Sequence, residues 1–230
     1  MSVKSSRKED TMTTAIIGVG KIGTTVARHL VNGGERVIVA SHGAGQAEAM
    51  AKELGKNARA ATVEQAITEA DVVVFAVWFD TIKELISQHA RLLEGKVVVD
   101  PSNPIKAGDG GKFVRTLPDG VSSGAEIAKR LPKGAHYVKA LGTLGAEALA
   151  TSSNRTPSRA ALYYATDDRQ AATAIERLIT AAGFDAVKAG GVDASLRIEV
   201  FGDLHQYGGL NGKVPDRAEA VAALARKKGA

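Results

Sequence analysis

Short apolar runs alternate with segments of helical periodicity over the first two thirds of the chain. Continuous apolar runs of this length are typical of strands that are buried on both faces of a parallel sheet. The pattern predicts strands over residues 13–17, 36–40, 58–61, 71–77, 96–99 and 136–139, and helices over residues 21–32, 46–54, 63–69, 81–93 and 123–131. We therefore expect an α/β fold, a Rossmann-type doubly wound parallel sheet, with a loop over residues 100–120.

The last third of the chain has a different pattern. Residues 160–165 and 184–189 predict two strands around a helix at 168–182, and the chain from residue 192 predicts helix interrupted by the glycine-rich stretch 208–212. The polar N-terminus predicts a disordered tail, so Met12 could be the true start. We expect a disordered tail over residues 1–12, a Rossmann domain over 13–150, and a small C-terminal α/β-helical subdomain over 151–230. This subdomain is expected to pack on the sheet and complete the acceptor site.

Composition narrows the function classes. The absence of cysteine excludes disulfides, thiol catalysis and cysteine metal sites, and we expect no metal. The basic residues are spread along the chain and aromatic residues make up only 4% of it, so we expect no nucleic-acid partner. Apolar runs fall short of the roughly 20 residues that span a membrane, and the N-terminus lacks the apolar core of a signal peptide. We expect a cytoplasmic protein without a membrane partner.

A glycine pattern follows the first predicted strand. Gly18-Val19-Gly20-Lys21-Ile22-Gly23 lies directly between that strand and the next helix. In this setting the first glycine makes a tight turn, the second lets the backbone approach a phosphate, and the third lets helix and strand pack closely. The amides at the helix N-terminus would face the pyrophosphate of a dinucleotide. The loop therefore predicts binding of a nicotinamide dinucleotide.

The end of the second predicted strand indicates which dinucleotide is bound. Enzymes that use NAD usually place an Asp or Glu there to bind the ribose 2′-hydroxyl. This chain has Ser41 and His42 at that position, and the next carboxylate is Glu48. A hydroxyl and an imidazole can donate hydrogen bonds to a 2′-phosphate, so the residues favour NADP(H) over NAD. The alternative for His42 is an exposed loop histidine without a ligand.

Two further loops follow predicted strands and should lie at the same edge of the sheet. Ala76-Val77-Trp78 follows the fourth strand, where Trp78 would either line the nicotinamide pocket or anchor the next helix. Asn103-Pro104 follows the fifth strand, and Asn103 can hydrogen-bond ribose or carboxamide. The loops predict the nicotinamide end of the cofactor site.

These four segments, in this order and spacing, resemble the family of NADP-dependent reductases that act with the deazaflavin coenzyme F420. The resemblance runs from Thr13 to about Gly202 and places Leu141, Gly142 and Thr143 in the acceptor pocket, after Val138-Lys139-Ala140. It implies NADP(H) as cofactor and hydride transfer to coenzyme F420 or to a flavin such as FMN or FAD. The chain departs from the family at Val77-Trp78-Phe79, which lacks a proline, and at Leu141-Gly142, which replaces Phe-Asn.

Hydride transfer between two rings needs positioning more than acid–base chemistry. We therefore expect an NADP-dependent oxidoreductase that works without a catalytic base. If a side chain does take part in proton transfer, the candidates are His136 and His205 at the edge of the pocket. The alternatives are an NADPH-dependent reductase of another small carbonyl or imine substrate and a non-enzymatic NADP(H)-binding sensor. Because little chain is left to cover the acceptor, a homodimer is expected to close the site.

Overall fold

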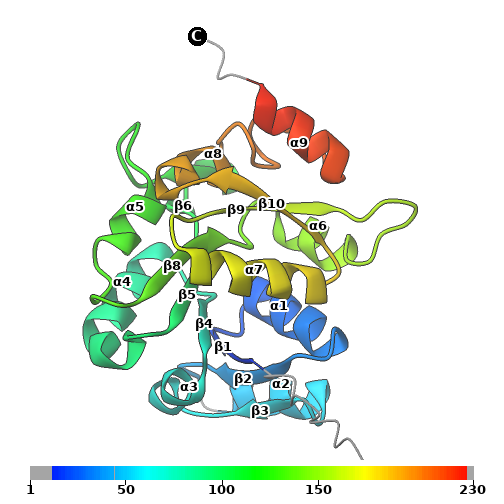
Figure 1. The fold of residues 1–230 in the computed structure, drawn as a ribbon. Helices are drawn as coiled ribbons and strands as arrows, with labels where there is room; N and C mark the ends of the chain where they lie inside the picture. The colour runs from blue at the N-terminus through cyan, green and yellow to red at the C-terminus, as the bar shows by residue number, and fades with distance from the viewer. Residues whose placement is uncertain (1–11, 44, 227–230) are drawn as a thin grey trace, which may run out of the picture.

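The computed structural model, which describes residues 12–43 and 45–226, contains an eight-stranded sheet (Figure 1). The strands lie in the order β10-β9-β8-β5-β4-β1-β2-β3. Their bounds are β1 Thr13–Ile17, β2 Arg36–Ala40, β3 Ala58–Ala60, β4 Val72–Phe75, β5 Val97–Asp100, β8 His136–Ala140, β9 Ala161–Ala165 and β10 Asp185–Gly190. The six strands from β3 to β8 along this order are parallel, and β9 runs antiparallel to β8. The predicted α/β Rossmann-type sheet is confirmed.

The helices follow most of the strands along the chain. They are α1 Lys21–Asn32, α2 Gln46–Leu54, α3 Val63–Glu69, α4 Phe79–His89, α5 Ser123–Ala128, α6 Ala146–Thr151, α7 Arg169–Ala181, α8 Ser195–Ile198 and α9 Arg217–Ala225, with short 3-10 turns η1 Ala90–Leu93, η2 Asp109–Gly111 and η3 Val192–Ala194. Within the described ranges, no helix is long and apolar enough to cross a membrane. The predicted tail lies outside the described residues except for Met12.

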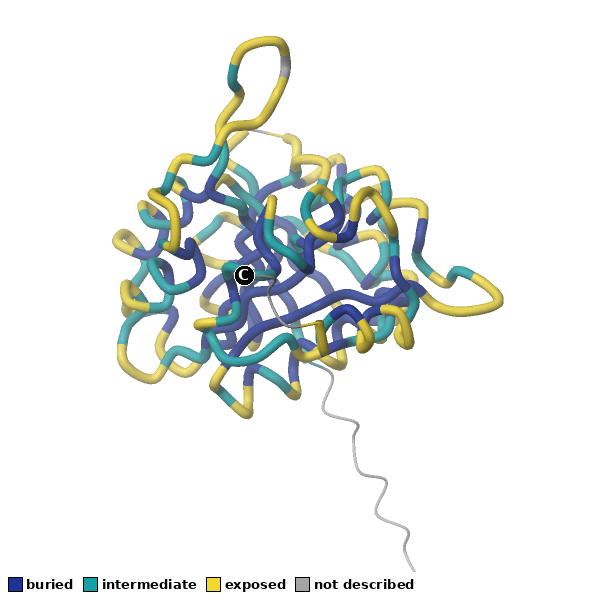
Figure 2. Tube along the Cα trace, turned by 90° about the horizontal axis from the view of Figure 1, so that it is seen from above, coloured by how far each residue is buried: buried dark blue, intermediate teal, exposed yellow. Residues whose placement is uncertain are grey.

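Both faces of the sheet are covered by helices because side chains alternate along each buried strand. In β1, Ile16 points to the face where Leu30 of α1 and Ile175 of α7 pack. Ile17 points to the opposite face, against Ile82 of α4. Figure 2 shows the buried backbone in the middle of the molecule and exposed turns around it. With both faces covered, loops at the strand ends are left to bind ligands.

The C-terminal segment joins the sheet, which corrects the expectation that it packs on it. Strands β9 and β10 extend the sheet beyond β8, and α7 covers one face of them. On the other face, Tyr163 of β9 packs with Ile198 of α8 and Ala220 of α9. The same sheet therefore carries both the predicted cofactor loops and the C-terminal segment.

Three parts of the sequence prediction differ from the structure. Residues 105–115, expected as loop, form a hairpin of β6 Ile105–Ala107 and β7 Phe113–Arg115. The six-residue helix α6 was not expected. The expected helix from residue 192 is interrupted for longer than predicted: η3 and α8 are helical, but the chain is then irregular until α9, which begins at a capping box between Asp216 and Glu219.

Candidate cofactor and acceptor site

The loops at the carboxyl ends of five parallel strands lie side by side in the order β2, β1, β4, β5, β8. Neighbouring strands are about 4.8 Å apart, so these loops form a continuous edge. Along it lie residues 41–43, the glycine loop 18–23, residues 76–78, residues 101–104 and residues 141–145. Ligands of doubly wound sheets bind at this edge. The order places the predicted acceptor pocket next to the predicted nicotinamide end.

The glycine loop has the packing that its three glycines predict. Gly18 has a φ of +109°, and a Cβ atom there would lie 2.4 Å from the carbonyl oxygen of Ala76. A Cβ on Gly23 would lie 2.0 Å from the carbonyl oxygen of Gly18. At Gly20, in contrast, a Cβ would meet nothing within 4 Å. The first and third glycines therefore serve the protein's own packing, while the second leaves open space above the backbone.

That open space lies at the N-terminus of α1. Gly20 is the N-cap residue, and no side-chain hydrogen bond caps the helix there. The amides of the first turn lack intrahelical partners and can bind an anion, and Lys21 is exposed beside them. Val19 and Ile22 turn partly buried side chains onto the core. These features fit a dinucleotide pyrophosphate.

The loop after β2 is tied to the glycine loop. The backbone amide of Gly18 donates to the carbonyl oxygen of Ala40 at 2.8 Å, which brings Ser41 close to the glycine turn. The Ser41 hydroxyl donates to the carbonyl oxygen of Gly43 at 3.0 Å, and His42 is exposed. Because a hydroxyl can rotate and can also accept hydrogen bonds, both side chains stay accessible to a ligand.

The loop after β4 lies between the glycine loop and β5. Ala76 packs against the glycine loop, and Val77 is partly buried on the side of α4. Trp78 is the N-cap residue of α4, but its side chain is 62% exposed. The indole therefore does not anchor the helix by burial, and it is free to contact a ligand.

Asn103 connects three segments of the protein at this edge, in addition to any role in ligand binding. Its Nδ2 donates to the carbonyl oxygen of Gly142 at 3.1 Å, and its Oδ1 accepts from the amide of Val200 at 2.6 Å. The side chain thus joins the β5 loop, the β8 loop and the C-terminal segment. One of its two amide hydrogens is not used by these bonds. Pro104, the next residue, is buried at the base of the hairpin and accepts from the amide of Thr116.

The loop after β8 is mostly buried. Leu141 is buried with a φ of +65°, a left-handed conformation that is disfavoured for a branched side chain. The carbonyl oxygen of Gly142 accepts hydrogen bonds from Asn103 and from His205. Thr143 is buried, and its hydroxyl has no hydrogen-bond partner among the described residues. The backbone, rather than the side chains of residues 141–143, therefore shapes this end of the site.

The two candidate histidines lie at opposite edges of the sheet. His136 is the first residue of β8, and its Nδ1 contacts Oδ2 of Asp168 at 2.7 Å. This position removes His136 from the predicted acceptor pocket, which corrects the sequence prediction. His205 lies beside Gly142, where its Nε2 bonds the Gly142 carbonyl oxygen and its Nδ1 accepts from the amide of Tyr207.

Both ring nitrogens of His205 are therefore hydrogen-bonded to backbone groups. Burial lowers its pKa to about 4, against a smaller raising effect of the bond to Gly142. The ring is neutral at pH 7, with the proton on Nε2 because that atom must donate to the carbonyl oxygen. His205 positions the β8 loop rather than transferring a proton.

A group of buried polar side chains behind this edge escaped the sequence prediction. Lys139 in β8 donates to Oδ2 of Asp100 at 2.9 Å, to the carbonyl oxygen of Ser102 and to the hydroxyl of Ser123. The hydroxyl of Ser123 in turn donates to the buried carboxylate of Glu199. We call Asp100, Ser123, Tyr137, Lys139 and Glu199 the Lys139 network. Its only signal in the sequence is a charged residue within or at the end of an apolar run.

Burial and the charge of Asp100 raise the pKa of Tyr137 in this network well above its ordinary value. The phenol therefore stays protonated and donates to Oδ2 of Asp100 at 2.9 Å. The Asp100 carboxylate also accepts from the amide of Ser102 at 2.8 Å. The network thus fixes the loop that carries Asn103.

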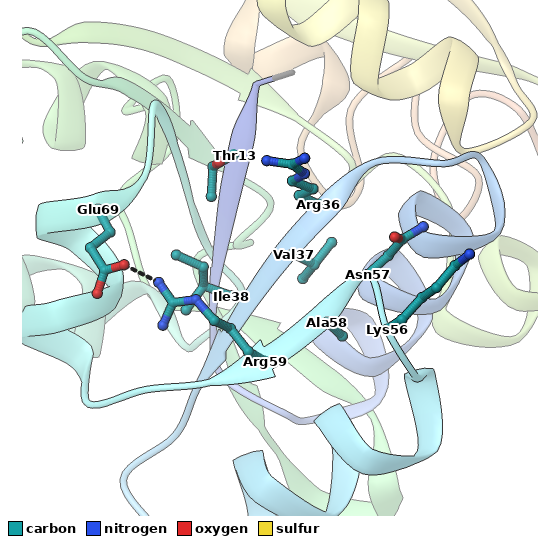
Figure 3. A pocket seen from close by; sticks show the side chains of 9 residues that line it. All are labelled: Thr13, Arg36, Val37, Ile38, Lys56, Asn57, Ala58, Arg59 and Glu69. Atoms are coloured by element: carbon teal, nitrogen blue, oxygen red, sulfur yellow. Dashed lines mark hydrogen bonds and ion pairs between the residues drawn. The ribbon is translucent and has the colours of Figure 1, made fainter. Parts of the chain in front are cut away.

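A hollow of about 590 Å³ lies at the opposite edge of the sheet (Figure 3). Thr13 and Arg36, which line it, are the first residues of β1 and β2, and an ion pair joins Arg59 to Glu69 at its rim. Its other lining residues are Val37, Ile38, Lys56, Asn57 and Ala58. Dinucleotides bind at the carboxyl ends of such strands, so this hollow is separate from the candidate site.

Comparison with known families supports the cofactor assigned to this edge. Residues 13–104, which hold the glycine loop, Ser41, Trp78 and Asn103, match the family described as NADP oxidoreductase, coenzyme F420-dependent. Over this segment the chain is similar to that family. The resemblance deduced from the sequence is confirmed. The match supports an NAD(P)-dependent oxidoreductase and NADP(H) binding.

Solved structures share the fold. A hypothetical protein from Sinorhizobium meliloti is 29% identical, with a TM-score of 0.75 over 84% of this chain and 93% of that one. A candidate F420-dependent NADP reductase from Arthrobacter sp. FB24 is 23% identical, with a TM-score of 0.67 over 79% and 86%. A reductive aminase from Aspergillus terreus is 18% identical, with a TM-score of 0.59 over 80% of this chain but 57% of that longer one. At such identities the last two show the fold alone.

Proposed function

We propose that the protein transfers a hydride between NADPH and a planar redox acceptor such as coenzyme F420 or a flavin. The observation that carries the proposal is the state of the ionisable groups around the acceptor end. His205 is bound to two backbone groups, and Lys139 and Glu199 are buried in the Lys139 network. None of these three groups is poised to exchange a proton with a substrate, so they support a reaction that depends on positioning two rings.

The chain's own residues would hold the cofactor along the carboxyl edge. The first-turn amides of α1 and Lys21 would bind the pyrophosphate, Ser41 and His42 the 2′-phosphate, and Trp78 would lie beside the nicotinamide. When bound, NADPH supplies a hydride with two electrons, and a solvent proton completes the reduced acceptor. The Lys139 network and Asn103 would keep the acceptor side rigid, so that the rings meet in a fixed geometry.

Replacing Ser41 with aspartate is expected to weaken NADPH binding at least tenfold, while NADH binding changes by less than about twofold. The reason is repulsion between the new carboxylate and the 2′-phosphate. Titration calorimetry with both cofactors measures the two affinities. Ser87→Asp, an exposed serine within α4, is the charge-matched control. Equal losses for NADPH and NADH in the Ser41 variant would show that Ser41 does not lie at the phosphate.

Oxidation of NADPH measured against coenzyme F420, FMN, FAD, quinones and ferric chelates tests the acceptor. The proposal expects turnover with F420 or a flavin. Turnover only with small carbonyl or imine compounds would favour the alternative reductase, and tight NADPH binding without any turnover would favour a sensor.

The proposal includes a homodimer. Strands β9 and β10 extend the sheet instead of covering its carboxyl edge, so a second subunit would complete the enclosure. A strictly monomeric enzyme at assay concentration, measured by sedimentation, would contradict this part of the proposal.

A further inference from the structure

Phe201 has an unusual combination of backbone strain and exposure. Its φ is +70°, a left-handed conformation that is disfavoured for a bulky side chain. Its side chain is nevertheless 52% exposed, so burial of the ring does not compensate for the strain. Strained residues of this kind persist where the surrounding structure enforces them, and they concentrate at functional sites. The surroundings of Phe201 therefore need an explanation.

The backbone on both sides of Phe201 is held by specific contacts. The preceding residue, Val200, donates its amide to Oδ1 of Asn103 at 2.6 Å. The following residue, Gly202, donates to the carbonyl oxygen of Glu199 at 2.8 Å and accepts from the amide of Gly209 at 3.0 Å. A Cβ on Gly208 would lie 2.0 Å from the carbonyl oxygen of Gly202. The glycine-rich stretch thus packs backbone against backbone beside Phe201.

Glu199 anchors the same segment to the Lys139 network. Its buried Oε1 accepts from the hydroxyls of Ser122 and Ser123 at 2.9 Å each and from the amide of Gly124 at 3.0 Å, and Arg115 lies 3.4 Å from its Oε2. These hydrogen bonds, together with the chain itself, form a closed circuit. Glu199 is linked through Ser123 and Lys139 to the carbonyl oxygen of Ser102 in the β5 loop. Asn103, the next residue of that loop, binds the amide of Val200, which follows Glu199 in the chain. Phe201 follows directly on this circuit.

This circuit lies at the acceptor end of the edge. Asn103, which it contains, is the residue that also binds the Gly142 carbonyl oxygen. Tyr207, 56% exposed, comes from the same segment and lies over Gly145 in the β8 loop. Trp78, which is also exposed, follows β4, one strand nearer than β5 to the glycine loop. Aromatic side chains left in solvent beside such a site are suited to stacking on a planar ligand.

We propose that Phe201 is the residue on which the ring of the acceptor stacks, and that Asn103 and Glu199 are positioning residues which hold it there. The inference rests on the proposed function and adds to it a residue that selects planar aromatic acceptors. The strained backbone would then hold the ring in solvent, one residue beyond the Val200 amide that Asn103 binds.

Phe201→Gly separates this role from a structural one. Glycine relieves a positive φ, so the variant is expected to keep its Tm or gain about 2–4 °C. Its affinity for FMN or F420, measured by quenching of the probe's fluorescence with NADP⁺ bound, is expected to fall at least about tenfold. The NADPH affinity should stay within about twofold. Phe201→Tyr, which keeps a ring, should bind the probes like the wild type, and Val221→Ala, an exposed truncation on α9, is the control.

Several results would overturn the inference. Unchanged probe affinity in Phe201→Gly, in an enzyme that does reduce the probe, overturns the role of Phe201 and leaves the proposed function standing. A large fall in Tm shows that the ring is structural, and dissociation of a dimer without loss of probe binding shows that it is a subunit contact. A wild-type protein that binds neither probe overturns the proposed function and this inference together.

Discussion

Replacing Gly20 with glutamate is expected to abolish measurable NADPH binding, a loss of at least about 100-fold, without unfolding the protein. Gly20 has ordinary extended dihedral angles, and a Cβ there meets nothing within 4 Å, so a larger residue fits the free protein. The new carboxylate would occupy the place of the pyrophosphate and repel its charge. As an anion at the N-terminus of α1 it would also stabilise the helix slightly. Titration calorimetry gives the affinity, and thermal unfolding confirms that the fold is retained.

Two variants serve as controls for this prediction. Gly20→Ala should also fold normally and bind NADPH more weakly than the wild type, since even a methyl group keeps the phosphate from the backbone. Asn57→Glu adds the same charge at the hollow on the opposite edge (Figure 3) and should leave NADPH binding unchanged. If Asn57→Glu weakens binding and Gly20→Glu does not, the cofactor lies at the hollow and the assigned edge is wrong.

Replacing Lys139 with methionine is expected to lower the free energy of unfolding by about 3–5 kcal/mol. The ammonium group is buried with Asp100, and its removal leaves the carboxylate of Asp100 buried with hydrogen bonds only from Tyr137 and Ser102. A loss of this size corresponds to a fall in Tm of roughly 6–20 °C for a protein of this length. Urea unfolding at pH 7 measures the change.

The double variant Asp100→Asn with Lys139→Met distinguishes an unpaired charge from lost packing. It is expected to recover a large part of the stability, because no buried charge is then left without a counter-ion. Arg130→Met, which breaks a solvent-accessible pair with Glu126, should leave the free energy of unfolding nearly unchanged. A Lys139 variant no less stable than the Arg130 variant would contradict the assigned role of the pair.

The first part of the fold was predictable because its signals are local. A strand buried on both faces is a continuous apolar run, and β1, β2 and β4 were found in this way near their observed positions. The glycine loop was predictable because the strand before it and the helix after it are both visible in the sequence, and its glycines form the turn between them. The hairpin of β6 and β7 was missed because its strands are only three residues long and are separated by glycines.

The C-terminal segment shows where local signals fail. Residues after α8 carry enough helix-forming side chains to suggest a helix, yet their backbone groups bond to distant parts of the chain. Gln206 donates its amide to the carbonyl oxygen of Thr143, and its side chain accepts from the amide of Gly145. Such contacts replace the bonds a helix would have made, and periodicity within the segment does not reveal them.

The sequence by itself thus determined the parallel part of the sheet and the glycine turn between β1 and α1, and it predicted the residues along the edge that would bind NADP(H). Only the tertiary structure decided how the acceptor end is built. It placed His136 and His205 at opposite edges, because strand direction decides which end of β8 faces the site. It also joined Asn103 to Val200, 97 residues away in the chain, and Lys139 to Asp100. The physical reason is that a buried polar group forms a hydrogen bond with a group that the fold brings within about 3 Å. That partner can lie far away in the sequence, so local patterns do not reveal it.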